Sequence, residues 1–255
     1  MGGKFHLGNS VKKIRGPLYE PAKSTIMIKS FFKERTRNFP DAVVNAGGTE
    51  LEVNKWILSD FVLANLIHVV GAHPFPLDEL MLMTSAVVRF KPEYIFEWGT
   101  HIGKSARIFY ETTKAFNIPC IIHSVDLPES AEHIEHPHEK HGMLVKGIKE
   151  VKLHRGDGIL KAIEIYKSLN NVSRVLFFID GDHSYESVKR ELSIVINEVK
   201  NPAILLHDTF FQSKESGYNI GPFQATQDIL AGKENEYRII STQGGLPGMT
   251  LVYKR

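Results

Sequence analysis

The apolar positions of this chain change their spacing near residue 91. Before that point, "EVNKWILSDFVLANLIHVV" and "LDELMLMTSAVVRF" carry apolar residues at helical spacing, with "AHPFP" between them. After it, short apolar runs alternate with helical stretches, and the runs are "EYIFEW", "CIIHSVD", "VKLHRGD", "RVLFFID" and "AILLHD". Strands that are apolar almost throughout and alternate with helices predict a parallel sheet covered on both faces.

The same pattern predicts the helices and the end of the chain. We expect helices between the strands at residues 104–116, 138–149, 158–169 and 184–199. At the end, "YRIIST" and "MTLVYK" flank the loop "QGGLPG", which predicts a hairpin. The expected architecture is therefore α/β, with five parallel strand–helix units and a C-terminal hairpin. A helical N-terminal cap would span residues 1–90, and the second domain would span 91–255.

Acidic residues follow the apolar runs, one at the end of each expected strand. They are Glu97, Asp126, Asp157, Asp180 and Asp208. In an open α/β sheet, ligands bind outside the carboxyl ends of the strands, so five acids at five such ends indicate a binding site. The alternative for any one of them is capping of the next helix, a position that Asp favours.

The stretch "FEWGTHIGKS" resembles a phosphate-binding loop but departs from it. Trp98 stands where a P-loop has its first glycine, and His101 stands where a dinucleotide fingerprint has its middle glycine. What remains is a strand that ends in Glu97, followed by Gly99 and Gly103 before a helix. Such a turn allows a ligand to approach the backbone closely, and the acid disfavours phosphate. A cationic or zwitterionic ligand fits better.

Composition and charge narrow the class of protein. The chain has 255 residues and a formal net charge of +2, which gives no electrostatic reason to expect a nucleic-acid partner. Its longest apolar region, 56–70, is interrupted by polar residues, so we expect no membrane span. Cys120 is the only cysteine, which excludes an intrachain disulfide, and its apolar surroundings indicate a buried strand thiol. Without a signal-peptide pattern, a cytoplasmic protein is expected.

With these motifs in order, the chain resembles the class I S-adenosylmethionine-dependent methyltransferases. The matching stretches are "FEWGTHIGKSA", "SVDL", "HRGDG", "FIDGDHSYESV" and "LLHDT", and the resemblance spans about residues 93–255. The pair "DGDHSYE" and "HDT" is similar to the branch of macrocin O-methyltransferases and proteins named cephalosporin hydroxylases. The resemblance implies a Rossmann-like seven-stranded methyltransferase sheet with a reversed last strand.

The resemblance also implies which residues bind the cofactor S-adenosylmethionine. Residues of the first motif would line its methionine and ribose side: Glu97, Gly99, His101, Gly103 and Ser105. Asp126 would accept the ribose hydroxyls, and Asp157 with Gly158 would flank the adenine.

For the chemistry, the resemblance implies a divalent metal on Asp180 and Asp208, with His183 as the general base. The residues support this independently, because the fourth and fifth strands are neighbours in such a sheet. Two carboxylates suit Mg²⁺, which would lower the pKa of a coordinated hydroxyl. Catechol-type relatives have Asn after the second metal Asp, whereas this chain has Thr209. The third ligand stays open between His207, Thr209 and a remote acid.

Two loops and one cap complete the candidates. The segment "EHIEHPHEKH" reads as a solvated loop or lid, with a zinc site as the alternative. The loop after Asp208 offers Phe210, Phe211 and Tyr218 for substrate contact. Asp182 is expected to cap the helix that begins near Ser184.

Taken together, the sequence predicts an O-methyltransferase that depends on S-adenosylmethionine and a divalent metal and acts on a small-molecule hydroxyl. A sugar, a glycoside or a catechol would each fit as substrate. One alternative is a non-haem iron oxygenase, with His183, His207 and one Asp as ligands. Another is a non-catalytic protein that binds S-adenosylmethionine. A homo-oligomer formed through the N-terminal cap is compatible with the sequence.

Overall fold

The centre of the molecule is a seven-stranded sheet. The computed structural model describes residues 41–128, 130, 140–170 and 172–255. The strand order is β3-β2-β1-β4-β5-β7-β6. The strands are β1 (Tyr94–Trp98), β2 (Ile121–Asp126), β3 (Val151–Arg155), β4 (Val175–Ile179), β5 (Ala203–His207), β6 (Tyr237–Ser241) and β7 (Met249–Lys254). Strands β1 to β5 run parallel, and β7 runs antiparallel to β5 and β6. This confirms the predicted seven-stranded sheet with its five parallel strands and its reversed last strand.

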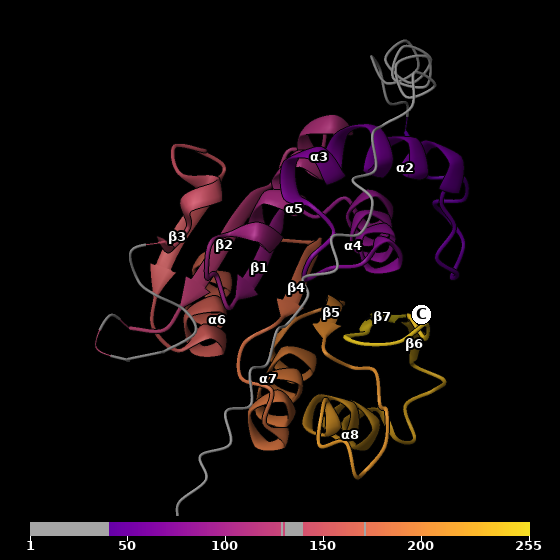
Figure 1. Cartoon of the computed structure of the whole chain (residues 1–255), viewed down its shortest axis with the longest axis vertical. Coiled ribbons are helices and arrows are strands. Elements are labelled where there is room, and N and C mark those ends of the chain that lie inside the picture. Colours follow the sequence, from indigo (N-terminus) through magenta and orange to yellow (C-terminus); the bar gives the residue numbers. More distant parts are fainter. Residues whose placement is uncertain (1–40, 129, 131–139, 171) are drawn as a thin grey trace, which may run out of the picture.

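Helices cover both faces of the sheet, with α2 to α5 on one side and α6 to α8 on the other (Figure 1). Those on the first side are α2 (Lys55–Phe61), the π-helical turn η1 (Val62–Leu66), α3 (Ile67–Val70), α4 (Leu77–Phe90) and α5 (Lys104–Ala115). Those on the second side are α6 (Gly158–Ser168), α7 (Tyr185–Glu198) and α8 (Ile220–Leu230). A short 3-10 turn, η3 (Met143–Val145), follows β2.

Side-chain alternation along the strands divides the core in two. On β1, Ile95 packs with α4 and α5, whereas Phe96 and Trp98 pack with α6 and α7. Adjacent strand residues point to opposite faces. Glu97 therefore points to the same side as Ile95, toward α4 and α5. The alternation along each apolar strand thus fixes the face of the sheet to which the polar residue at its end points.

Two expected helices differ from the structure. The described part of the stretch 138–149 forms turns and η3 rather than an α-helix. Gly142 and Gly147 adopt φ values of +61° and +83° there, which lie outside helical geometry. The first amphipathic segment is helical but not uniform, because η1 separates α2 from α3. A π-turn of this kind shifts the register of the apolar stripe.

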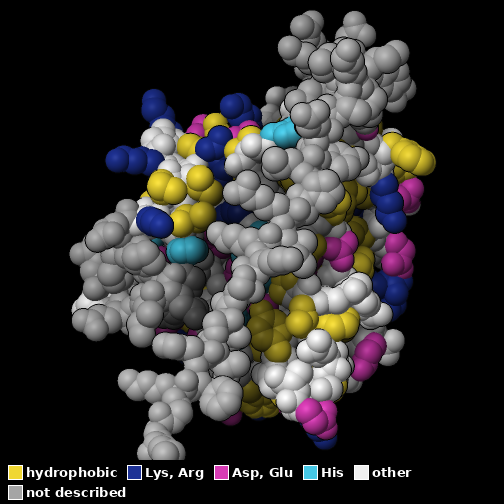
Figure 2. Space-filling view, viewed as in Figure 1, with side chains coloured by type: hydrophobic (Ala, Val, Ile, Leu, Met, Phe, Trp, Pro, Cys, Tyr) yellow, Lys and Arg dark blue, Asp and Glu magenta, His cyan; other side chains and the backbone are white. Residues whose placement is uncertain are grey.

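The division into a cap and a second domain stays a prediction. Residues 1–40 lie outside the described residues, but α4 shares one apolar core with β1, β4 and β5. On the face shown in Figure 2, the described Lys and Arg side chains are interspersed with acidic and apolar ones. Among the described residues, no helix combines the length and apolar character needed to cross a bilayer. Cys120 lies buried just before β2, and burial raises the pKa of its thiol to about 12.

Candidate active site

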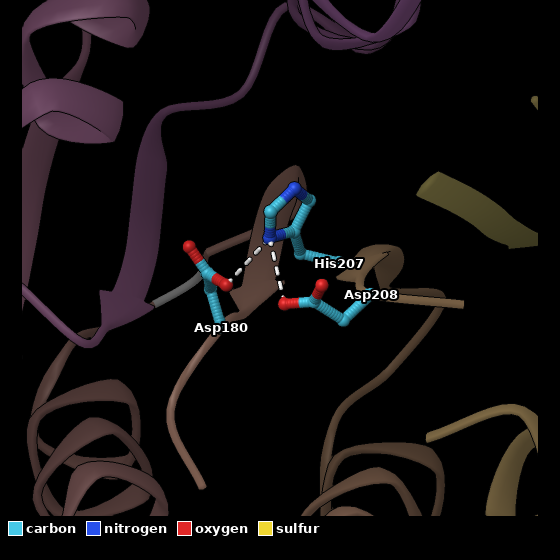
Figure 3. Close-up of side chains that lie close together, drawn as sticks. All are labelled: Asp180, His207 and Asp208. Atoms are coloured by element: carbon cyan, nitrogen blue, oxygen red, sulfur yellow. Dashed lines mark hydrogen bonds and ion pairs between the residues drawn. The ribbon is translucent and has the colours of Figure 1, made fainter. Parts of the chain in front are cut away.

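Three side chains meet where β4 and β5 end. The Asp180, His207 and Asp208 ligand atoms all lie within 4.8 Å of one another (Figure 3). They converge because β4 and β5 are parallel neighbours in which Ile179 pairs with Leu206. Asp208 holds a φ of +56°, a left-handed value that is uncommon for a non-glycine residue and is often found at functional sites. The sequence predicted that the two aspartates would meet, and the structure brings them together.

His207 lies between this pair and a buried acid from α4. Its Nδ1 is 2.8 Å from Asp180 Oδ1, and its Nε2 is 3.1 Å from Glu79 Oε2. The other oxygen of Glu79 accepts a hydrogen bond of 2.8 Å from the backbone N–H of Gly248. The rings of Phe75 and Phe178 pack around the imidazole, with ring centroids 4.8 and 6.3 Å from its own. His207 is thus a buried, hydrogen-bonded residue that also belongs to the cluster.

Glu79 was missed by the sequence reasoning, although a signal exists. It occupies the same buried stripe of α4 as Met83 and Ala86, at spacings of four and seven residues. Its exposed fraction is only 1%, and an acid in such a stripe needs a polar partner inside the protein.

The charges in the cluster compensate one another. Burial disfavours the imidazolium, yet the adjacent carboxylates raise the pKa of His207 well above its usual value. Burial also acts to raise the pKa of Asp180, but His207 and His183 prevail and hold it below the ordinary value. Without a metal, the two histidines therefore serve as counter-charges for the carboxylates.

His183 approaches the same two aspartates from the end of the β4–α7 connection, directly before the N-cap of α7. Its Nε2 is 3.1 Å from Asp208 Oδ2 and 3.8 Å from Asp180 Oδ1, and its side chain is half exposed. Interaction with Asp180, and then the charge of Asp208, raises the pKa of His183. A half-exposed imidazole beside the two carboxylates has the position that a general base needs.

The cap of α7 differs from the expectation. Ser184 is the N-cap, and its Oγ accepts a hydrogen bond from the backbone N–H of Ser187. Asp182 instead accepts hydrogen bonds from the backbone N–H and the hydroxyl of Ser184. Asp182 thus orients the capping serine rather than capping the helix itself.

Glu97 lies in a buried polar pocket at the end of β1. Its Oε1 accepts a 2.5 Å hydrogen bond from the Ser124 hydroxyl, which also pairs with Thr100 at 2.6 Å. Burial raises the pKa of Glu97 to about 7, and the charges of Asp180 and Asp126 act in the same direction. Its Oε2 has no hydrogen-bond partner among the described residues. A buried acid of this kind can accept a hydrogen bond from a ligand.

Two glycines shape the turn after Glu97. Gly99 has a φ of +90°, and a Cβ there would lie 2.1 Å from the carbonyl oxygen of Asp180. Gly103 has a φ of +82° and precedes α5, and its Cβ would lie 3.0 Å from Val145. Only glycine allows the chain to pass so close to the end of β4. The turn therefore connects the Glu97 pocket directly to the aspartate cluster.

The other residues of this motif are held in place. Ser105 is buried in the first turn of α5, and its hydroxyl, with that of Ser124, opposes the effect of burial on the pKa of Glu97. The carbonyl of His101 accepts a 2.8 Å hydrogen bond from the backbone N–H of Gly142. The motif is thereby tied to the segment that follows β2.

Asp126 ends β2 with both carboxylate oxygens in use. His141 Nδ1 lies 2.9 Å from its Oδ2, Arg155 lies 3.7 Å from the same oxygen, and the backbone N–H of Leu127 donates to Oδ1. Most of the histidine-rich segment lies outside the described residues, namely His133, His136 and His138. His141 is described, and it faces Asp126.

Asp157 and Gly158 have local structural roles. The Asp157 side chain caps α6 by accepting from the backbone N–H of Leu160, and it forms a 2.7 Å ion pair with Arg190. A Cβ on Gly158 would lie 2.4 Å from the Trp98 ring. The capping alternative is thus present in the structure. It does not exclude contact with a ligand, because the Asp157 side chain is 39% exposed.

The segment after Asp208 bears on the third ligand and on the substrate. The hydroxyl of Thr209 pairs with that of Thr250 at 2.8 Å, so Thr209 is engaged away from the cluster. The hydroxyl of Tyr218 lies 3.5 Å from Asp208 Oδ1. Phe211 stacks on Phe223 at 4.8 Å. Of the three predicted aromatic residues, Tyr218 is the one that reaches the aspartates.

Comparisons with known proteins agree with this geometry. Residues 96–209 match the family model Methyltransf_24, described as a methyltransferase domain. A sequence comparison with curated proteins gave no significant match. The matched part of the chain, residues 96–209, is therefore similar to a methyltransferase domain.

Solved structures with a similar fold include three methyltransferases. The SAH-bound PaMTH1 from Podospora anserina has 18% identity and a TM-score of 0.50, over 94% of this chain and 99% of that one. An O-methyltransferase from Bacillus cereus, in complex with SAH, has 12% identity and a TM-score of 0.53, over 83% and 95%. TomG from Streptomyces achromogenes, an O-methyltransferase involved in tomaymycin synthesis and solved with SAM, has 13% identity and a TM-score of 0.53, over 78% and 96%. At these identities the likeness concerns the fold.

The residues present fit both groups that the fold implies. Two carboxylates and an imidazole form a donor set for a divalent cation. On the cofactor side, the free oxygen of Glu97 and the close approach of Gly99 suit a ligand with a positive charge.

Proposed function

We propose that the protein is an S-adenosylmethionine-dependent O-methyltransferase that requires a divalent metal and acts on a hydroxyl of a small molecule. The observation that carries the proposal is the aspartate pair at the ends of β4 and β5, with His183 beside it. The methyltransferase fold supports the transferase reaction. Two of the similar structures are described as O-methyltransferases, which supports oxygen as the acceptor.

In this proposal the residues at the ends of the strands form two sets, one for the cofactor and one for the acceptor. The cofactor is held by the first set: Glu97, Gly99, His101, Gly103, Ser105, Asp126, Asp157 and Gly158. When bound, the cofactor supplies both the methyl group and its leaving group. The protein therefore has to align the acceptor oxygen with that methyl group, and such alignment is worth roughly 7–11 kcal/mol of the barrier.

The second set activates the acceptor. Asp180 and Asp208 would hold a divalent cation, for which the sequence predicts Mg²⁺, and His207 is the third ligand that the geometry favours. The cation supplies, when bound, the Lewis acidity that lowers the pKa of a substrate hydroxyl. His183 Nε2 accepts the hydroxyl proton, and Tyr218 lies near enough to Asp208 to contact the substrate. A sugar, a glycoside or a catechol fits this arrangement. The cytoplasmic location and self-association through the cap stay predictions.

Binding measurements test the cofactor and the metal separately. By calorimetry we expect S-adenosylhomocysteine to bind, and ATP and NAD not to bind. Asp180→Asn and Asp208→Asn should each abolish metal-stimulated methyl transfer while leaving the affinity for S-adenosylhomocysteine nearly unchanged. Binding of ATP without S-adenosylhomocysteine would reject the methyltransferase, and full activity in excess chelator would remove the metal from the mechanism.

The role of His183 requires a rate measurement with a panel of catechols and glycosylated hydroxyl compounds. His183→Ala should lower the maximal rate by about 10²–10⁴-fold, the usual contribution of a general base. His183→Gln should be impaired to a similar degree, because an amide cannot accept the proton. Cofactor and metal affinity serve as controls and should change little. Rates near that of the wild type in both variants would refute the base assignment.

One observation favours an alternative reaction. His183, His207 and Asp208 lie together, and two histidines with one carboxylate are the ligand set of non-haem iron oxygenases. Substrate turnover that needs Fe²⁺, oxygen and a reductant would select this alternative. Binding of S-adenosylmethionine without turnover of any substrate would favour the non-catalytic binding protein.

A further inference from the structure

A buried acid from α4 and a histidine at the end of β5 form a polar contact that links the first helical layer to the aspartates. Glu79 Oε2 and His207 Nε2 are 3.1 Å apart, and both side chains are almost fully buried. Nothing in the proposed reaction requires an acid at this place. The contact nevertheless decides which nitrogen of His207 faces the metal ligands.

We propose that Glu79 is a positioning residue that keeps the proton of His207 on Nε2 and presents Nδ1 as a nitrogen ligand. The site then prefers an imidazole-binding divalent transition metal, such as Fe²⁺ or Co²⁺, over Mg²⁺. This inference rests on the proposed metal site and names the class of metal it takes. The sequence led us to expect Mg²⁺ because two carboxylates suit that ion and the third ligand stayed open.

The hydrogen bonds around Glu79 admit one arrangement. The backbone N–H of Gly248 can only donate, and it donates to Glu79 Oε1 at 2.8 Å. Oε2 then remains for His207, and a carboxylate oxygen can only accept. Nε2 must therefore carry a proton. A histidine metal ligand characteristically donates its second N–H to a carboxylate, which fixes the tautomer and the ring orientation.

The other nitrogen faces the metal ligands. His207 Nδ1 lies 2.8 Å from Asp180 Oδ1 and 3.2 Å from Asp208 Oδ2. The rings of Phe75 and Phe178 restrict rotation of the imidazole. With Nε2 engaged by Glu79, Nδ1 is the nitrogen that remains to bind a cation together with the two aspartates.

A nitrogen donor changes the choice of metal. Mg²⁺ favours oxygen ligands and retains water, whereas imidazole suits Fe, Ni and Zn, and affinity for a mixed nitrogen and oxygen site rises along the first transition series. Transition metals bind most sites more tightly than Mg²⁺, so the absolute preference is a weak test. The change in the ratio of the two affinities, when the nitrogen alone is disabled, is a strong one.

The isosteric variant Glu79→Gln disables the nitrogen without creating a cavity. The amide oxygen must face the Gly248 N–H, so the NH₂ group faces His207 Nε2, which then has to accept. The proton of the neutral imidazole moves to Nδ1 and blocks it as a ligand. Outer-sphere partners of this kind typically contribute about 10–100-fold to metal affinity.

The experiment compares Co²⁺ and Mg²⁺ affinity in the wild type, Glu79→Gln and His207→Gln, by calorimetry on the full chain. We expect Glu79→Gln to weaken Co²⁺ binding by at least about tenfold and Mg²⁺ binding much less, so that the ratio falls as it does in His207→Gln. Glu191→Gln is the matched control, because Glu191 is also a buried acid but lies on α7, outside the cluster. Its ratio should equal that of the wild type, and thermal denaturation checks that each variant is folded.

Nitrogen NMR of the Zn²⁺-loaded wild type gives a readout independent of activity. It should show a proton on His207 Nε2 and none on Nδ1. A proton on Nδ1 in the Zn²⁺-loaded protein, or an equal loss of Co²⁺ and Mg²⁺ affinity in Glu79→Gln, would overturn the inference. The same samples report on the proposed function through S-adenosylhomocysteine binding and methyl transfer. Failure of those two with an intact metal ratio would reject the transferase and leave the metal preference standing.

Discussion

Glu97 and Asp180 end two neighbouring strands, β1 and β4, which pair in parallel up to Trp98 and Ile179. Burial acts to raise the pKa of both carboxyl groups. The outcome differs: the pKa of Glu97 rises to about 7, whereas that of Asp180 falls below its ordinary value. The opposing effect at Asp180 comes from its neighbours His207 and His183.

The two halves of the site obtain their counter-charges from different sources. Asp180 has His207 and His183 beside it, so the protein itself supplies positive charge. The charged groups that act on Glu97 in the described part of the chain are Asp180 and Asp126, which are both acidic. The β1 half is therefore complete only with a ligand that brings a positive charge or a hydrogen-bond donor. The β4–β5 half is balanced internally until a cation replaces the protons on its histidines.

The junction of the two halves is the most sensitive point of the site. Gly99→Ala would put a Cβ 2.1 Å from the backbone oxygen of Asp180 at a φ of +90°. We expect a loss of more than about 4 kcal/mol in the free energy of unfolding, because backbone has to shift against backbone. Gly147→Ala is the control, since its φ is +83° but its Cβ would meet nothing within 4 Å. That variant should lose only about 1–2 kcal/mol.

Denaturant titration measures both variants. Equal losses for Gly99→Ala and Gly147→Ala would mean that the backbone conformation alone is costly. The two halves would then not be locked together by the close approach of Gly99 to β4.

The second prediction concerns the stability that is lost when the buried carboxyl group of Glu97 ionises. The folded pKa of Glu97 is about 7 and its unfolded value is 4.5, so the folded state binds the proton more tightly. Stability without ligand should therefore fall as the pH rises from 4.5 to 7. Glu97→Gln should be more stable than the wild type at pH 8, by up to about 3 kcal/mol. The gain should vanish below pH 4.5, where the glutamate is protonated in both states.

Glu191→Gln provides the matched control, because burial raises the pKa of Glu191 to about 7 as well. Both variants should become more stable at high pH, but only Glu97→Gln should bind S-adenosylhomocysteine more weakly, by about tenfold or more. Unfolding at several pH values and calorimetry separate the two effects. Unchanged affinity in Glu97→Gln would remove Glu97 from the cofactor site.

Sequence patterns predicted the part of this site that depends on strands. Apolar runs fixed where β4 and β5 end, and parallel pairing then brought Asp180 and Asp208 together. Glu79 could not be predicted in the same way, because its contact with His207 depends on how α4 packs over the sheet. The apolar stripe of α4 marks Glu79 as a buried acid, but a sequence separation of 128 residues leaves no local signal for its partner His207.

Local chemistry also explains the two errors. The helix expected at 138–149 fails in its described part, where two glycines take left-handed φ values. Asp182 was expected to cap α7 because Asp favours the N-cap position. Ser184, which directly precedes the first residue of α7, is the N-cap instead. In the second case the residue-type preference was right that a side chain caps α7 and wrong about which residue does so.

The smallest effect concerns Asp157, which caps α6 and was predicted to flank the adenine. Asp157→Ala should lose about 1 kcal/mol of stability through the missing cap. The exposed ion pair with Arg190 should add little to that loss. If the side chain also accepts a hydrogen bond from the adenine, the affinity of Asp157→Ala for S-adenosylhomocysteine should fall by roughly tenfold, the value of one hydrogen bond. Asp157→Asn keeps an oxygen acceptor and should preserve both properties. Denaturant titration and calorimetry on the same samples test this directly. If Asp157→Ala loses stability but binds as tightly as the wild type, Asp157 is a helix cap alone. The adenine contact would then have to come from another residue.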